Sequence, residues 1–189
     1  MIIGNPACFA IESRINKPYE RLSFLALGFF VIYVNGRRYG VYKPDASMLA
    51  CSYREVEDRI AARGMHVAPF ASRSDASAIA ISFRDALYAE NQAISYLGIE
   101  TSEFSNLFYS NHLIWAPDGD EAFNDSSYVL QFDVMDSVRL VAFTSAESFH
   151  YDSGTLNEVW ISAEEYYSIL QKWHDAFQSE WETLPKHSE

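Results

Sequence analysis

Basic side chains are scarce over almost half of this chain of 189 residues. Residues 85–171 contain one of them, Arg139, against fifteen aspartates and glutamates. This segment carries a charge of −14, whereas residues 1–84 carry +4 and residues 172–189 carry −2. Such an uneven distribution raises the local potential and speeds the encounter with a cationic partner by roughly 10–10³-fold. The charge pattern therefore predicts a docking surface within the acidic segment.

Cysteine and long hydrophobic runs are also scarce. Cys8 and Cys51 match no metal-binding or redox spacing, so we expect two buried thiols in a reducing compartment. The longest apolar stretch, residues 24–34, is shorter than the roughly 20 residues that span a bilayer, and it predicts a buried strand. The N-terminus lacks the basic and apolar regions of a secretion signal. These absences predict a cytoplasmic protein with no membrane partner. The length of 189 residues fits one domain over residues 1–189.

Residues with the spacing of a metal or catalytic site are lacking as well. The five histidines share no ligand spacing, and the chain has no phosphate-binding glycine loop and no nucleophile elbow. Asp118, Asp120 and Glu121 lack the remaining ligands and the glycine of a calcium loop. The Ser-x-His-x-Asp pattern at residues 148–152 would form a row on a strand and not a nested triad. We therefore predict no catalytic residue, no metal site and no cofactor.

The residues that are present favour strands in the first quarter of the chain. Residues 2–11 and 22–34 are apolar and rich in β-branched and aromatic side chains. Asn35 and Gly36 then supply the pair of positive φ angles that a two-residue hairpin turn requires, and residues 37–42 alternate behind them. This pattern predicts an antiparallel hairpin.

Three segments have helical spacing. Ser52 and Glu55 form a capping box, so we expect a helix from Ser52 to Gly64, and a second helix over residues 75–90. Ser162 and Glu165 form another capping box, which opens a helix that runs to about residue 182. One broad apolar face of this last helix carries Tyr166, Ile169, Leu170, Trp173, Phe177 and Trp181.

The remaining segments complete an α+β fold. Residues 91–124 are rich in Ser and Asn and predict long loops around short strands. Residues 128–134 and 138–143, joined at Asp136–Ser137, predict an antiparallel pair, and residues 158–161 a short strand. We expect a mostly antiparallel sheet with two central helices and a long C-terminal helix packed on it.

The N-terminal residues Met1-Ile2-Ile3-Gly4-Asn5-Pro6 and Phe9-Ala10-Ile11 resemble the opening of the immunity protein 42 family of bacterial polymorphic toxin systems. The segments Gly28-Phe29-Phe30, Val34-Asn35-Gly36 and residues 159–166 are similar to that family too. The resemblance implies a protein that binds the toxic C-terminal domain of a cognate polymorphic or contact-dependent toxin. It further implies that the toxin is blocked stoichiometrically and without catalysis, by a monomer or a homodimer.

Many such toxins are nucleases, which must present cationic groups to phosphate, so an acidic surface would mimic that phosphate. Direct binding of nucleic acid is disfavoured, because the acidic segment would repel phosphate. Buried aromatic anchors would supply most of the affinity. The predicted toxin-binding residues are Glu100, Glu103, Trp115, Asp118, Asp120, Glu121, Phe123, Asp125, Tyr128, Asp133, Asp136 and Tyr151.

Two alternatives of other classes stay open. The aromatic content is compatible with a sensor domain that binds a small molecule in an aromatic pocket. The many carboxylates are compatible with a hydrolase that uses two of them, which would require paired acids with a raised pKa in a cleft.

Overall fold

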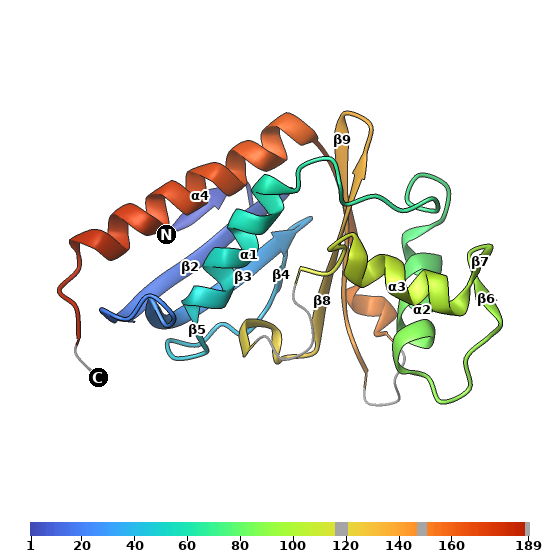
Figure 1. The fold of residues 1–189 in the computed structure, drawn as a ribbon, viewed down its shortest axis with the longest axis horizontal. Coiled ribbons are helices and arrows are strands. Elements are labelled where there is room, and N and C mark those ends of the chain that lie inside the picture. Colours follow the sequence, from blue (N-terminus) through green and yellow to red (C-terminus); the bar gives the residue numbers. More distant parts are fainter. Residues whose placement is uncertain (116–120, 147–150, 188–189) are drawn as a thin grey trace.

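The structure of the chain, a computed structural model, describes residues 1–115, 121–146 and 151–187 (Figure 1). The first half builds an antiparallel sheet in the order β1-β2-β3-β4, in which β5 also pairs with β3. Its strands are β1 (Ile2–Gly4), β2 (Phe9–Pro18), β3 (Ala26–Val34), β4 (Arg37–Tyr39) and β5 (Ser47–Met48). The predicted strand over residues 2–11 is therefore two paired strands, because the chain reverses between Gly4 and Phe9.

The predicted hairpin is confirmed. Asn35 and Gly36 have φ angles of 49° and 83°, and they join β3 to β4 with Val34 paired to Arg37. Both positive angles match the right-handed twist of the flanking strands. The apolar stretch that was too short for a membrane is β3, with most of its residues buried. No helix of the described residues is long and apolar enough to cross a bilayer.

Two helices cover one face of the first sheet: α1 (Leu49–Ala61) and α4 (Ala163–Thr183) (Figure 1). The apolar face of α4 packs as predicted, with Trp173 against Phe30 of β3 at 5.1 Å between ring centroids. The N-terminal cap of α4 is also confirmed, because Ser162 Oγ accepts a hydrogen bond from the Glu165 amide at 3.2 Å.

The predicted start of α1 at Ser52 is wrong. The helix begins three residues earlier, at Leu49, and Met48 at its N-cap position makes no side-chain capping bond. β5 leads directly into the helix, and Leu49 is fully buried in the core between them. Burial of this side chain sets the start, and Ser52 becomes a buried residue within the first turn.

A second antiparallel sheet, in the order β10-β9-β8, separates the first sheet with α1 and α4 from α2 and α3 (Figure 1). Val129, Val138 and Leu140 pack toward the first sheet, whereas Leu130 and Phe132 pack toward the other two helices. These elements are β8 (Ser127–Val134), β9 (Ser137–Thr144), β10 (Asn157–Ser162), α2 (Ala76–Tyr88) and α3 (Thr101–Ser110). Short elements between them are β6 (Ser95–Tyr96), β7 (Ile99–Glu100) and the 3₁₀ turns Glu121–Phe123 and Ser153–Thr155.

Helix α3 lies in the segment that the sequence predicts to be loops. Phe104 and Phe108, four residues apart, are fully or almost fully buried, and both pack against Phe70. The Ser and Asn residues between them have low helix propensity, so tertiary packing of the two rings outweighs the local preference. With this helix added, the predicted α+β class with antiparallel sheets and a long C-terminal helix is confirmed.

The prediction of two buried thiols is wrong for one of them. Cys51 is exposed on α1, and Cys8 is partly buried. Burial raises the pKa of the Cys8 thiol, and the nearby Glu165 carboxylate raises it further. Both cysteines are free.

Candidate functional site

The predicted acidic residues lie at three separate places. Glu100 and Glu103 are at the start of α3, where Glu100 accepts a hydrogen bond from the Ser102 amide at 3.3 Å. Glu121 and Asp125 lie before β8, whereas Asp136 is in the turn that follows β8. An eight-residue strand is about 26 Å long, so β8 holds Asp125 and Asp136 well apart. Asp118 and Asp120 lie outside the described residues.

Two of the four predicted aromatic anchors belong to the core. Trp115 is 1% exposed and donates a hydrogen bond from Nε1 to the Tyr166 hydroxyl at 3.0 Å. Phe123 is 6% exposed and packs edge-on against Phe30. A partner could reach these rings only by opening the core, so these two predicted anchors are not accessible at the surface.

The other two anchors are half-buried beside α2. The Tyr128 hydroxyl accepts a hydrogen bond from Arg84 at 2.8 Å, and the Tyr151 hydroxyl bonds to Ser77 Oγ at 2.7 Å. Both rings pack against Phe143 of β9. Their hydroxyls serve internal contacts, and they lie apart from the exposed acidic residues of the β8–β9 turn.

The turn between β8 and β9 borders a concave surface. A groove of about 510 Å³ lies between this turn, the end of α1 and the first turn of α4. Met135, at the tip of the turn, is 95% exposed and has a φ angle of 53°. We call this surface the hairpin-tip groove; it is lined by Arg63, Gly64, Asp133, Met135, Asp136, Ser162, Ala163, Glu164 and Tyr167.

Three carboxylates give the hairpin-tip groove a negative charge. Asp133 is held in place by hydrogen bonds from the Tyr167 hydroxyl at 2.9 Å and the Gly64 amide at 2.7 Å. Asp136 is exposed, and the Glu164 side chain is 86% exposed although it lies 3.2 Å from Arg63. Burial, followed by the nearby Asp133 carboxylate, raises the pKa of Tyr167, so this phenol stays protonated as a donor.

A buried hydrogen-bond network supports the groove from below. Arg59, 1% exposed, donates to Gln131 Oε1 at 2.8 Å and to the Ile114 carbonyl at 2.6 Å. Gln131 Oε1 also accepts from the Tyr166 hydroxyl, and Gln131 Nε2 donates to Asp133 at 3.2 Å. The network joins α1, β8 and α4, and it reaches the groove at Asp133.

Arg59 of this network also pairs with a carboxylate outside the groove, that of Glu55. Glu55 has a pKa raised by burial, and its carboxylate lies 2.8 Å from Arg59 Nη2. In the described ranges no three His, Cys, Asp or Glu side chains are grouped so that they could hold a metal ion. The carboxyl group of Glu55, whose pKa is raised, is thus paired with a guanidinium.

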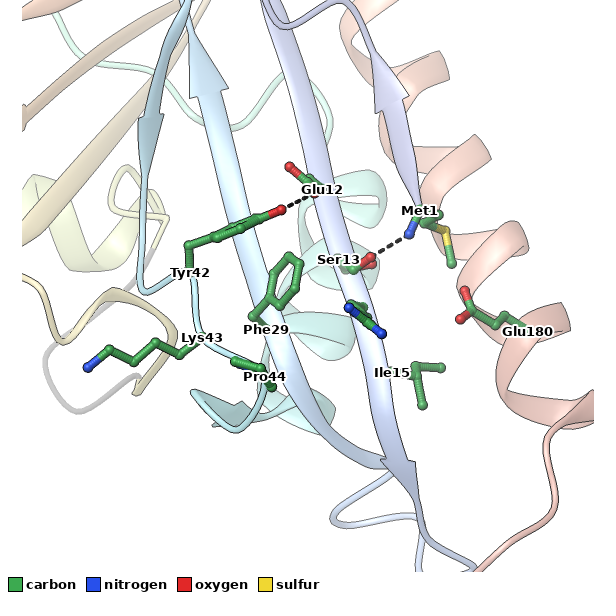
Figure 2. A pocket seen from close by; sticks show the side chains of 10 residues that line it. Met1, Glu12, Ser13, Ile15, Phe29, Tyr42, Lys43, Pro44 and Glu180 are labelled. Atoms are coloured by element: carbon green, nitrogen blue, oxygen red, sulfur yellow. Dashed lines mark hydrogen bonds between the residues drawn. The ribbon is translucent and has the colours of Figure 1, made fainter.

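A second hollow, of about 430 Å³, lies between β2 and β3 of the first sheet, the segment that follows β4 and the last part of α4 (Figure 2). The Tyr42 ring lies over Phe29 with 4.5 Å between centroids. Both oxygens of Glu12 are occupied, one by the Tyr42 hydroxyl at 2.9 Å and the other by the Tyr33 hydroxyl at 2.8 Å. The Glu12 carboxylate is thus taken up by internal contacts, and Arg14, Lys43 and Glu180 are further charged residues that line the hollow.

The sequence pointed to Asp133 and Asp136 but missed the rest of the groove. Arg63, Gly64 and Glu164 come from segments that are distant in the chain and meet at the β8–β9 turn. The turn consists of Met135 and Asp136, one residue earlier than predicted. An apolar residue is unusual at a hairpin tip, so Met135 was the one signal in the sequence that could have indicated this surface.

Comparisons with known proteins agree with this fold. The family model described as immunity protein 42 matches residues 1–176. The crystal structure of CdiI from Burkholderia dolosa AUO158 is similar in fold, with a TM-score of 0.58 and 16% sequence identity, over 93% of this chain and 99% of that chain. A search among curated proteins yields no match. Because the family model spans nearly the whole sequence, the chain belongs to the immunity protein 42 family.

Proposed function

We propose that the protein binds the toxic C-terminal domain of a cognate polymorphic toxin and blocks it stoichiometrically, with the hairpin-tip groove at the centre of the contact. One observation carries the location: Met135 is 95% exposed at the tip of the β8–β9 turn, between Asp133 and Asp136. An exposed, flexible thioether is a suitable anchor for an apolar pocket of the partner. Its burial in such a pocket is favourable because water solvates an apolar side chain poorly.

The surrounding charge suits a cationic partner. Asp133, Asp136 and Glu164 line the groove together with Arg63, whose guanidinium lies 3.2 Å from the Glu164 carboxylate. A nuclease domain presents cationic groups to phosphate, so its active surface is attracted to this groove and can be occluded by it. The protein acts by occupying that surface and needs no chemistry of its own.

The decisive experiment is co-expression and titration with the toxin domain encoded immediately upstream of the gene. We expect a one-to-one complex and rescue of growth. Met135→Lys should weaken binding by about 30-fold or more, the effect typical of an anchor residue that is replaced by a like charge. The matched control is Ile94→Lys, because Ile94 is an 89% exposed apolar residue outside the groove.

The outcomes separate the two parts of the proposal. Absence of a complex and of growth rescue would refute the function itself. A complex that tolerates Met135→Lys as well as Ile94→Lys would show that the groove is not the contact.

A further inference from the structure

The two edges of the second sheet differ in their hydrogen bonding. Along the outer edge of β8, the Trp115 amide donates to the Val129 carbonyl at 2.9 Å, and the Gln131 amide donates to the Leu113 carbonyl at 2.8 Å. The Asp133 amide donates to the His66 carbonyl at 2.6 Å. This edge is therefore closed by the chain's own backbone.

The other edge of the sheet is β10, and its register shows which groups point outward. The Ala163 amide donates to the Asp136 carbonyl at 2.9 Å, so Ser162 and Ser137 form a pair that exchanges no direct hydrogen bonds. Such pairs alternate along an antiparallel ladder. Glu158 and Trp160 therefore direct their backbone N–H and C=O groups away from β9, and no group of residues 1–115, 121–146 or 151–187 bonds to them.

The free edge lacks the usual protection. Exposed edge strands are commonly very short or carry Lys or Pro, which discourage pairing with another chain. β10 has six residues, Asn-Glu-Val-Trp-Ile-Ser, and contains neither. An open edge of this kind is suited to receive a strand from a partner.

The Trp160 side chain of β10 is exposed and is held by hydrogen bonding next to the free backbone groups. Trp160 is 47% exposed, and its Nε1 donates to Glu158 Oε1 at 2.8 Å. The same carboxylate oxygen lies 2.8 Å from Nε of the buried Arg139. The Trp160 ring is thereby held in one orientation beside the free backbone groups.

The edge is continuous with the hairpin-tip groove. Ser162, the last residue of β10, also lines that groove, and Glu164 and Glu165 follow it as exposed residues in the first turn of α4. A chain segment that pairs with β10 would therefore have one end close to the carboxylates of Glu164, Glu165 and the groove. The charge favours a segment with Lys or Arg side chains.

We propose that an extended, cationic segment of the toxin domain pairs with β10 and adds a fourth strand to the β10-β9-β8 sheet. This inference rests on the proposed function, because it names the second element of the same interface. The main chain supplies hydrogen bonds, and the Trp160 ring supplies an apolar contact beside them.

Amide exchange, measured residue by residue by NMR on the free protein and on its complex with the upstream-encoded toxin domain, tests the pairing. The amides of Glu158 and Trp160 should exchange rapidly in the free protein and at least about ten-fold more slowly in the complex. Val159 and Ile161 provide an internal reference, because their amides already face β9. Unchanged exchange at Glu158 and Trp160 in a complex that is weakened by Met135→Lys would overturn the strand pairing and leave the proposed function standing.

Two variants at one position provide an independent test. Trp160→Ala removes the ring and keeps the outward N–H, whereas Trp160→Pro removes both and leaves the ladder with β9 intact. Circular dichroism and thermal unfolding check that both variants fold. We expect Trp160→Pro to bind the toxin domain about ten-fold more weakly than Trp160→Ala, from the loss of one interfacial hydrogen bond; equal affinities of the two folded variants would contradict the pairing.

Other occupants of the edge give different results. Slower exchange of Glu158 and Trp160 in concentrated protein without toxin would mean that β10 pairs with a second copy of the chain, and would overturn the assignment to the toxin. Failure to form any complex would remove the proposed function and this inference with it.

Discussion

At the residue scale, Arg59 connects the parts of the molecule that form the groove. Its guanidinium contacts Gln131 of β8, the carbonyl of Ile114 and the carboxylate of Glu55, and it stacks on Trp115 at 4.4 Å. A buried charge is costly when it loses its partners, so each group depends on the others. The orientation of Asp133 in the groove follows from this arrangement through Gln131.

Replacement of Arg59 should be strongly destabilising. We expect Arg59→Met to lower the free energy of unfolding by about 3–5 kcal/mol, because Glu55 and Gln131 lose their donor inside the protein. Arg54→Met is the matched control, since Arg54 is exposed on the same helix, and its effect should stay within about 0.5 kcal/mol. Urea unfolding measures both; similar losses for the two variants would show that the network contributes no stability.

His66 should make stability depend on pH. Burial lowers its pKa from the ordinary 6.5, and the nearby Arg59 guanidinium lowers it further, while Asp133 acts in the opposite direction. Nδ1 lies 3.1 Å from the Asn111 and His112 carbonyls, and Nε2 is buried with no hydrogen-bond partner among the described residues. The folded protein therefore favours neutral His66.

Because its folded pKa is below the unfolded value, His66 contributes stability that is present above about pH 6.5 and is lost as the pH falls toward its folded pKa. Urea unfolding between about pH 7.5 and 5 should show this loss in the native protein and a smaller loss in His66→Asn, whose amide still donates to a carbonyl. Glu55, whose pKa burial raises, contributes with the opposite sign in both proteins and cancels in the comparison. Parallel pH profiles would exclude this role of His66.

At the scale of elements, the two Ser-x-x-Glu motifs have different roles. Ser162 caps α4 through its hydroxyl, whereas Ser52 lies inside α1, and its hydroxyl has no hydrogen-bond partner in the described parts of the chain. The two motifs have the same spacing, so the difference lies in what precedes them. β10 ends at the cap residue of α4, but β5 runs into α1 three residues before Ser52.

Substitution of each serine distinguishes these roles. Ser162→Ala should lower the free energy of unfolding by about 1 kcal/mol, the usual cost of an N-terminal cap. Ser52→Ala should cost nothing or stabilise slightly, since it removes an unsatisfied buried hydroxyl. Thermal unfolding of both variants provides the measurement, and equal losses would argue for a capping role of Ser52.

At the scale of the whole molecule, the acidic residues are divided among three places, so their contributions to association can be separated. Asp136→Asn with Glu164→Gln should slow association with the toxin domain by roughly ten-fold at low salt and flatten its salt dependence. Glu90→Gln with Glu103→Gln changes the net charge equally outside the groove and serves as the control. Stopped-flow measurements give the association rate constants of both double variants. Equal slowing by the two double variants would indicate that only the net charge of the protein affects association.

Local signals in the sequence were sufficient for several parts of the fold. The Asn35–Gly36 turn, the Ser162 cap with the apolar face of α4, and the antiparallel pair of β8 and β9 were predicted from interactions within a few residues. The family resemblance came from the same local segments and is confirmed. Helix α3 was missed, because its stability comes from contacts of Phe104 and Phe108 with residues far away in the chain.

The sequence by itself determined the α+β class, the family and the acidic character of residues 85–171. Only the tertiary structure decided that Trp115 and Phe123 are core residues, that Met135 is exposed among carboxylates from distant segments, and that β8 is covered while β10 has a free edge. The physical reason is range: turns, caps and net charge depend on neighbours in the chain, whereas burial, proximity and an unpaired strand edge depend on how distant elements pack.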